Sequence, residues 1–129
     1  MTEPGFPIER LKIRPDFLAA AKAPSCARGA IVLQARRRDD DLSLVRVGFT
    51  ATKKIGNAVV RNRAKRRMRE AARALVPLLG RAGHDYVFIA RSGAPTRPWE
   101  RLLDDVKSAL LSLAADSLPR ASTRAPSKS

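Results

Sequence analysis

Lysine and arginine are concentrated in one stretch, residues 53–73, which reads KKIGNAVVRNRAKRRMREAAR. The stretch holds nine Lys/Arg and one acid, Glu70, so it contributes nine minus one, or eight, of the fourteen net positive charges of the chain. A helix face that is merely solvated mixes both signs of charge for i,i+4 pairing, whereas here like charges repel one another. Phosphate groups would relieve this repulsion, so the pattern predicts a polyanion-binding surface.

Read as an α-helix at about 100° per residue, this stretch has an apolar face and a cationic face. The apolar face, which we expect to pack against the rest of the protein, comprises Val60, Ala64, Met68, Ala71 and Leu75. The opposite face comprises Asn62, Arg66, Arg69 and Arg73. We expect Asn57 to cap the helix start and Pro77 to end the helix.

Two adjoining anion sites are predicted on this segment. One is the helix start, where unpaired N–H groups and the positive end of the helix dipole attract anions. Its residues are Lys53, Lys54, Gly56 and Asn57. The other is the helix flank, whose cations are Arg61, Arg63, Lys65, Arg66, Arg67 and Arg69.

Few side chains in the sequence are suited to catalysis. His84 is the only histidine, and between Gly83 and Asp85 a surface or hydrogen-bonding role is favoured over general-base work. The acidic runs 39–41 and 104–105 are candidate metal ligands, but duties in a turn and in solubility suffice for both. The chain has no GxxxxGK[ST], GxGxxG or GxSxG motif. We therefore predict no catalytic residue and no metal site in the protein, and expect a partner to carry any chemistry.

Composition narrows the class of partner. With 129 residues, 44% of them hydrophobic, we expect one domain over residues 1–118. The 26 Lys/Arg against 12 Asp/Glu favour nucleic acid, with an anionic membrane surface as the rival. The membrane is disfavoured because no stretch approaches roughly 18 apolar residues and the basic helix lacks a Trp/Phe/Leu face. The absence of a signal-peptide pattern and the single Cys26 predict a cytoplasmic protein.

Hydrophobic periodicity predicts the remaining elements. A helix is expected from near Pro15 to Lys22, and alternation predicts strands over residues 30–38 and 42–52, paired as an antiparallel hairpin through the aspartates 39–41. Residues 85–91 read as a strand covered on both faces, in the middle of the sheet. A final helix is expected after Pro98, with one apolar face comprising Trp99, Leu102, Leu103, Val106, Leu110 and Leu113.

These elements predict an α/β (α+β) two-layer sandwich with one layer of helices on a small mixed sheet. The expected order is helix, strand, strand, basic helix, strand, helix, with a further short strand over residues 50–54. Residues 1–9 are expected to be a flexible lead and residues 119–129 a disordered basic tail. The polar face of the second strand suits the wall of a polar cleft as well as plain solvent; its residues are Arg46, Gly48, Thr50 and Thr52.

The stretch GFTATKKIGNAVVRNRAKRRMREAAR resembles the signature of the protein subunit of bacterial ribonuclease P. The hallmark is an Arg-Asn-Arg core inside a KK-x-G-x-A-V-x-RN-R-x-KR-x-x-R frame, and here the core is Arg61, Asn62 and Arg63. The segments RLKIRPDFLAAA, AIVLQARRR, HDYVFIAR and TRPWERLLDDV resemble other parts of the family in the same order. The resemblance covers about residues 10–113.

This resemblance implies a function and a mechanism. The family's enzyme is a ribonucleoprotein endoribonuclease that removes the 5′ leader of precursor tRNA, and its RNA subunit with bound Mg²⁺ carries out the hydrolysis. The protein would therefore bind ribonuclease P RNA, with 1:1 stoichiometry, and the precursor leader, and would hold no metal by itself. The family fold also implies a left-handed crossover between parallel strands around the basic helix, against the usual right-handed preference.

By resemblance, two RNA surfaces are expected. The catalytic RNA would contact Lys53, Lys54, Gly56, Asn57, Arg61, Asn62, Arg63, Lys65, Arg66, Arg67 and Arg69. The leader would lie in a cleft between the first helix and the sheet, near Phe17, Ala21, Gln34, Arg36, Arg46 and Thr50. Phe17 matches an aromatic position of the cleft, although simple packing of the first helix also explains it. Ala21 and Gln34 stand where the family often has aromatics, so hydrogen bonds and charge are expected to replace stacking there.

Other functions fit parts of the pattern. A ribosome-associated structural RNA-binding protein would need the same charge without any role in cleavage. A basic helix also fits the major groove of DNA, but the strands around it and the lack of a dimerisation heptad argue against the helix-turn-helix and basic-zipper readers. A protein with its own hydrolytic site would turn over substrate without RNA.

Overall fold

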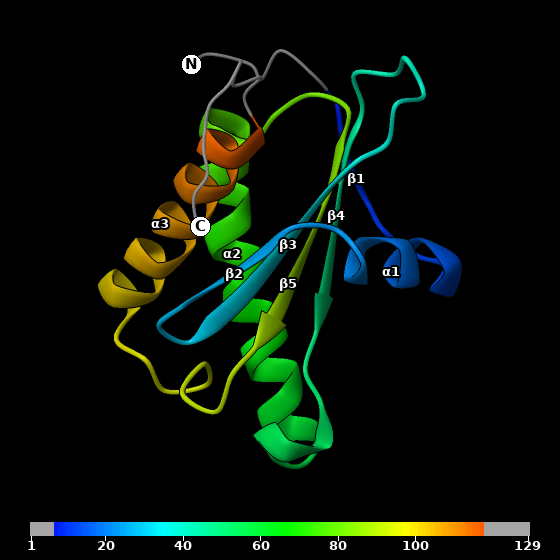
Figure 1. Cartoon of the computed structure of the whole chain (residues 1–129). Coiled ribbons are helices and arrows are strands. Elements are labelled where there is room, and N and C mark those ends of the chain that lie inside the picture. The colour runs from blue at the N-terminus through cyan, green and yellow to red at the C-terminus, as the bar shows by residue number, and fades with distance from the viewer. Residues whose placement is uncertain (1–6, 118–129) are drawn as a thin grey trace.

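The computed structural model describes residues 7–117, which fold as a five-stranded sheet with helices on both faces (Figure 1). The strands are β1 (Ile8–Arg10), β2 (Ser25–Arg28), β3 (Ile31–Arg37), β4 (Val45–Thr50) and β5 (His84–Ala90). The helices are α1 (Arg14–Ala21), the 3-10 turn η1 (Lys53–Ile55), α2 (Ala58–Leu79) and α3 (Trp99–Ser117). The predicted α/β class with a small mixed sheet is confirmed.

β5 lies at the centre of the sheet, whose strand order is β1-β4-β5-β3-β2. It pairs antiparallel with β3 and parallel with β4, and its residues from His84 to Phe88 are all buried. The predicted central position is therefore confirmed. The predicted hairpin between β3 and β4 is wrong, because β5 lies between these two strands.

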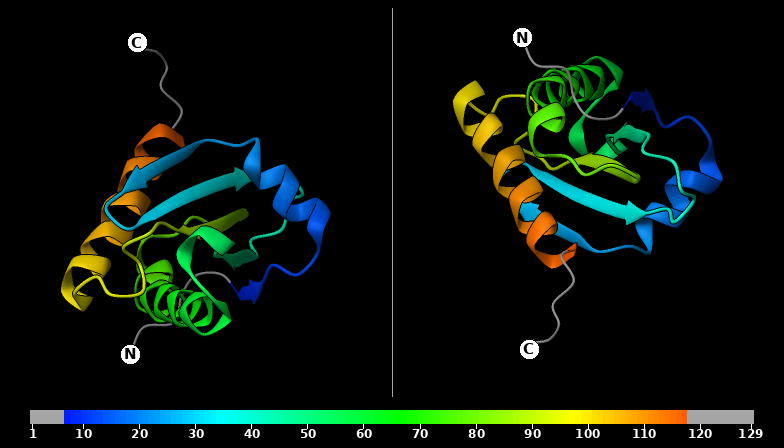
Figure 2. Two further views of the ribbon diagram at one scale, coloured as in Figure 1. Left: turned by 90° about the horizontal axis from the view of Figure 1, so that it is seen from below. Right: turned by 90° about the horizontal axis from the view of Figure 1, so that it is seen from above.

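α2 and α3 form one layer on the sheet (Figure 2). The largest fully buried side chains of this main core include Ile31, Leu33, Met68, Phe88, Leu102 and Leu110. α1 packs on the opposite face, where Leu11, Ala20 and Val87 form a second apolar cluster with Phe17 and Ile89. The predicted two-layer sandwich with one layer of helices thus holds for α2 and α3, and α1 adds a partial third layer.

α2 connects the parallel neighbours β4 and β5. Its predicted apolar face is confirmed, since Ala64, Met68 and Ala71 are buried. Pro77 does not end the helix as predicted; α2 runs on to Leu79. Pro77 has no N–H to donate to the Arg73 carbonyl and so costs α2 one hydrogen bond, but it lies in the last turn, only two residues before the helix ends. The left-handed sense of the crossover stays a prediction.

Short segments account for the other differences. Residues 50–54 do not form a further strand: β4 ends at Thr50, and η1 follows. The lead predicted over residues 1–9 includes Ile8 and Glu9, which belong to β1. β1 and β2 are edge strands of three and four residues, too short to show a periodicity. Residues 1–6 and the predicted tail, 119–129, lie outside the described residues.

Candidate nucleic-acid interface

The start of α2 is shaped by Gly56 and Asn57. The Asn57 side-chain oxygen accepts a hydrogen bond of 3.0 Å from the Val60 N–H, so the predicted N-cap is confirmed. Gly56 has φ 146°, and a Cβ atom there would lie 3.0 Å from the Val60 Cβ, so only glycine fits without strain. Lys53 and Lys54, in η1, are exposed beside this start. The turn therefore brings two lysines to the positive end of the helix.

The outer face of the first half of α2 is a groove with a volume of about 510 Å³, which we call the basic groove. Its lining residues are Val59, Asn62, Arg63, Lys65, Arg66 and Arg69. Asn62, Arg63 and Arg66 are exposed, and Lys65 and Arg69 are half-buried. The groove contains four cations and no acid. Its potential is therefore strongly positive, which suits a chain of phosphates.

Three of the cations predicted on the helix flank are not simply exposed on the outer face of α2. The Arg67 guanidinium donates a hydrogen bond of 2.7 Å to the Ala94 carbonyl and another to the Arg97 carbonyl, so it fastens α2 to the turn before α3. Arg61 is half-buried at the helix start. Arg69 was expected to point away from the packed face, but its guanidinium carbon lies 6.0 Å from the centre of the Phe49 ring, over the sheet.

The second candidate surface is the sheet face that α1 partly covers. Strand register places its side chains in three rows across β4, β5 and β3. The rows are Arg46–Asp85–Arg36, Gly48–Val87–Gln34 and Thr50–Ile89–Val32. The face therefore grades from charged at one end to mostly apolar at the other.

Phe17 of α1 reaches this face at its middle row. The Cε1 atom of Phe17 lies 2.6 Å from where a Cβ atom of Gly48 would be. Phe17 is half-buried, so the ring both packs α1 against the sheet and leaves one part accessible. Ala21, the other predicted residue of α1, is exposed. The structure thus brings Phe17 next to the row of Gln34, and places Thr50 one row further on.

The charged row is an ion-pair network centred on Asp85, whose side chain is 0% exposed. Arg46 binds it through two hydrogen bonds of 2.8 Å and also contacts Asp16 of α1 at 3.0 Å. Arg38 binds it at 2.9 Å, and Arg36 at a longer 3.4 Å. The hydrogen bond to Asp85 raises the pKa of Arg46. Arg46 is thus held by two carboxylates, whereas within the described part of the chain Arg36 contacts a carboxylate once, at 3.4 Å.

Sequence reasoning did not identify Asp85 and Arg38 as partners. Arg38 is 4% exposed at its side chain and also binds Asp40 at 2.8 Å. Burial works to lower the pKa of Arg38, but hydrogen bonds from it to Asp40 and Asp85 raise the value overall. The sequence did contain an indication of this ion-pair network, since Asp85 begins an otherwise apolar strand that was predicted to be covered on both faces. A carboxylate buried there requires cationic partners.

The other polar candidates have structural partners. Asp105 was expected to serve solubility, but it is buried, binds the guanidinium of Arg97 at 2.7 and 3.0 Å and accepts a hydrogen bond from the Ala30 N–H. His84 is buried, with Nδ1 3.0 Å from the Ala82 carbonyl, so the predicted hydrogen-bonding role is confirmed. Within residues 7–117, no three His, Cys, Asp or Glu side chains are grouped so as to hold a metal ion.

A mixed sheet crossed by a cationic helix, with a basic groove on that helix, defines a small α/β nucleic-acid-binding protein. Comparison with known proteins places it within that class. The family model described as Ribonuclease P matches residues 7–114, and the chain belongs to the ribonuclease P protein family. The known role of this family is processing of the 5′ leader of tRNA. No helix in the described part of the chain is long and apolar enough to cross a membrane.

Relatives and solved structures agree with this assignment. The chain is 66% identical over 121 residues to a ribonuclease P protein component of Caulobacter vibrioides, covering 94% of this chain and 80% of the relative. It is 53% identical over 110 residues to that of Ruegeria pomeroyi, covering 84% and 88%. The RNase P protein of Staphylococcus aureus superposes with a TM-score of 0.67 at 27% identity, covering 81% and 94%. That of Thermotoga maritima gives 0.63 at 29% identity, covering 85% and 98%.

Proposed function

We propose that this chain is the protein subunit of a ribonuclease P whose RNA subunit performs the catalysis. The observation that carries the proposal is the basic groove, which gathers four cations and no acid on one exposed helix face. An RNA backbone neutralises such a surface and releases counterions on binding. The protein binds one RNA subunit, 1:1, in the cytoplasm, and adds no catalytic side chain of its own.

The catalytic RNA contacts the basic groove and the adjoining helix start. Arg63 and Arg66 are exposed and extend from α2 with no acid in the groove, so both are available to phosphates. Lys53 and Lys54 add charge where the helix dipole is positive. Mg²⁺ is bound mainly by the RNA, where it supplies the charge stabilisation for phosphodiester hydrolysis.

The precursor leader lies against the sheet face beside α1. Phe17 offers part of a ring for stacking, and Gln34 lies across Val87 from Gly48, the residue under that ring. Arg36 keeps donors for a phosphate because, among residues 7–117, its one ion pair is 3.4 Å long. Arg46 is committed to Asp85 and Asp16, so we propose that it orients α1 and contacts the leader less than Arg36 does.

The proposal is tested by reconstitution with the RNA subunit from Caulobacter vibrioides, whose protein is a relative at 66% identity. At low Mg²⁺ the protein should accelerate cleavage of precursor tRNA over RNA alone. Arg63→Ala should weaken assembly with the RNA subunit, and Arg101→Ala, an exposed arginine of α3 outside the groove, serves as the control. Cleavage no faster than with RNA alone would refute the assignment.

The two surfaces are separated by a second comparison. Phe17→Ala should reduce binding of leader-bearing precursor more than binding of mature tRNA, because only the precursor reaches the α1 face. Arg63→Ala should reduce both, since it acts through assembly. If both variants lower the two affinities by the same factor, the leader surface is misplaced.

A further inference from the structure

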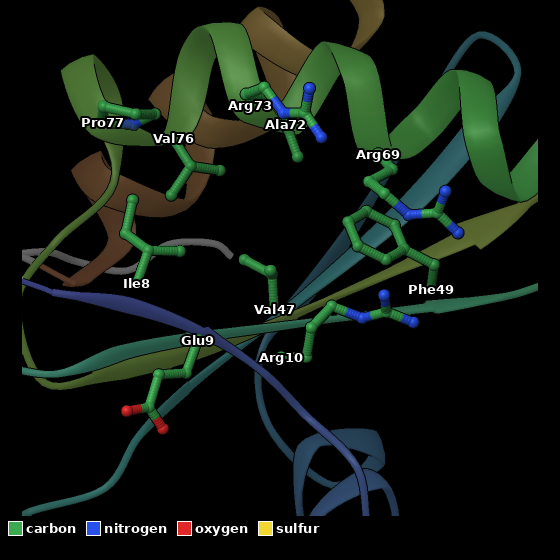
Figure 3. Close-up of a pocket in the computed structure, with 10 residues that line it drawn as sticks. All are labelled: Ile8, Glu9, Arg10, Val47, Phe49, Arg69, Ala72, Arg73, Val76 and Pro77. Atoms are coloured by element: carbon green, nitrogen blue, oxygen red, sulfur yellow. The ribbon is translucent and has the colours of Figure 1, made fainter.

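A second cavity, which we call the β1–α2 cavity, lies between the edge strand β1 and α2 (Figure 3). Its volume is about 340 Å³, in the range of about 300–1,000 Å³ usual for small-molecule sites. Most of its wall is apolar, formed by Ile8, Val47, Phe49, Ala72, Val76 and Pro77. The cavity suits an apolar ligand group.

Cations surround this apolar wall. Arg10, Arg69 and Arg73 line the cavity together with one acid, Glu9, and the Glu9 side chain points away from α2 (Figure 3). Glu70 lies 3.6 Å from Arg73, but the two side chains are 49% and 70% exposed, so the pair is weak. An occupant that combines an apolar ring with negative charge would be complementary to this site.

Phe49 and Arg69 form one end of the cavity. The Phe49 ring is held by stacking on Phe88, with centroids 5.5 Å apart, and carries the Arg69 guanidinium 6.0 Å above its own centre. The Arg69 Nε atom is buried and makes no hydrogen bond within residues 7–117. An unsatisfied buried donor is costly, so the Arg69 side chain would gain a hydrogen bond by turning Nε toward an acceptor atom on an occupant.

Arg69 also joins the β1–α2 cavity to the basic groove, because its side chain lines both. A strand that follows the groove past Arg66 therefore reaches the mouth of the cavity. Proteins that bind unpaired RNA hold splayed bases on aromatic rings and arginine planes. Phe49 and Arg69 supply one of each at the point where the two hollows meet.

We propose that the β1–α2 cavity receives one unstacked nucleotide of the RNA bound along the basic groove. The base lies against Phe49 and the apolar wall, and its phosphate lies between Arg69 and Arg73. The inference rests on the proposed function for the identity of the RNA. A docking peptide is the competing occupant, and the tests below tell the two apart.

Nuclear magnetic resonance of the full chain tests the site without the RNA subunit. The probes are AMP, CMP, GMP and UMP, with ribose 5-phosphate as the control that lacks a base. Backbone amide signals of Ile8, Val47 and Phe49 should shift with at least one nucleotide and not with ribose 5-phosphate. Equal shifts with ribose 5-phosphate, or shifts confined to residues 57–66, would overturn the proposal. A docking peptide would then be the remaining candidate occupant of the cavity.

Variants test the site within the assembled particle. Phe49→Leu keeps the wall apolar but removes the ring, and should lower affinity for the Caulobacter vibrioides RNA subunit about tenfold, as expected for one stacked base. Arg73→Gln should lower it several-fold, whereas Arg101→Gln should not. Thermal unfolding shows whether each variant is folded. If Phe49→Leu is unstable, the affinity of Arg73→Gln for the RNA subunit tests the proposal, because Arg73 is exposed and its substitution should not disturb the fold.

The outcomes separate this inference from the proposed function. If Arg63→Ala abolishes RNA binding while Phe49→Leu and Arg73→Gln bind like the parent, the subunit assignment stands and the nucleotide site is refuted. If the parent protein neither binds the RNA subunit nor accelerates cleavage, the proposed function fails instead. Retained nucleotide-induced shifts at Val47 would in that case still support a base-binding cavity.

Discussion

The ring of Phe17 lies directly on Gly48. A Cβ atom added to Gly48 would stand 2.6 Å from the Phe17 Cε1 atom and 3.2 Å from the Leu11 Cβ. Gly48 does not have a positive φ, so its small size and not its backbone freedom is what the fold uses. The glycine in the middle of β4 lets α1 approach the sheet closely.

Gly48→Ala should therefore destabilise the protein through overpacking, by about 1–3 kcal/mol. The same change should weaken leader binding, because Phe17 must move. Urea unfolding measures the first effect, with Gly93→Ala as the control, since a Cβ there would be 3.9 Å from its nearest neighbour, Ala30. Equal stability of the two variants would show that α1 shifts freely.

Asp85→Asn should be strongly destabilising. The carboxylate is fully buried and neutralises Arg46 and Arg38, and removing one partner of a buried ion pair costs about 3–5 kcal/mol. Asp104→Asn, at an exposed position of α3, is the matched control and should change little. Denaturant midpoints of the two variants decide the point, and a midpoint for Asp85→Asn near the parent value would contradict the network's importance.

Tyr86 should titrate above its ordinary pKa in the folded state. Burial raises the pKa of this phenol, although the hydrogen bond from the Arg81 N–H opposes the shift. A raised folded pKa means that the associated stability is present below about pH 10, the unfolded value, and is lost as pH rises through the folded value. Because it is the only tyrosine, tyrosinate absorbance reports it directly. Identical midpoints in buffer and in denaturant would contradict the prediction.

Tyr86→Phe provides a second readout of the same group. Near neutral pH it should lower stability by about 1 kcal/mol, because the Arg81 N–H loses its acceptor. Above about pH 10 the difference from the parent should shrink, since only the parent then loses stability by ionising in the unfolded state. A constant difference from pH 7 to 11 would be inconsistent with this linkage.

Arg66 and Arg67 are neighbours with different expected roles. Arg66→Met should lower affinity for the RNA subunit and reduce its salt dependence by about one phosphate contact, with stability unchanged, because Arg66 is exposed in the basic groove. Arg67→Met should cost about 1–3 kcal/mol of stability, because two backbone carbonyls lose a charged donor. RNA affinity as a function of salt concentration and thermal unfolding should be measured for both variants. A loss of stability in Arg66→Met, or a loss of affinity without a loss of stability in Arg67→Met, would contradict the prediction.

The elements with strong periodicity could be predicted from the sequence. The apolar face of α2 and the doubly covered β5 follow from residue patterns alone, and so do the N-cap at Asn57 and the cationic flank. The pairing of the strands could not be predicted. The aspartates 39–41 have the composition of a hairpin turn, and nothing in the local sequence indicates that β5 lies between β3 and β4. The prediction that Pro77 ends α2 was wrong, because the effect of a proline on a helix depends on how close it lies to the helix end.

The site was predictable in outline and not in its contacts. Exposed cations such as Arg63 are recognisable by spacing, whereas Arg67 has the same residue type and binds carbonyls 27 and 30 residues further along the chain. The Asp85 network has the same origin: Arg36 and Arg46 are on the two strands that flank β5, and Arg38 directly follows one of them. Long-range partners of this kind depend on register, which no single segment encodes.

The central position of β5 has a consequence for how the protein is made. Residues 84–90 leave the ribosome after β3, β4 and the whole of α2. Until β5 is synthesised, the edges of β3 and β4 that will pair with it remain unpaired. Late, non-local pairing of this kind slows folding and exposes strand edges to aggregation. We expect nascent chains stalled before residue 84 to be protease-sensitive, and the sheet to form in one late cooperative step.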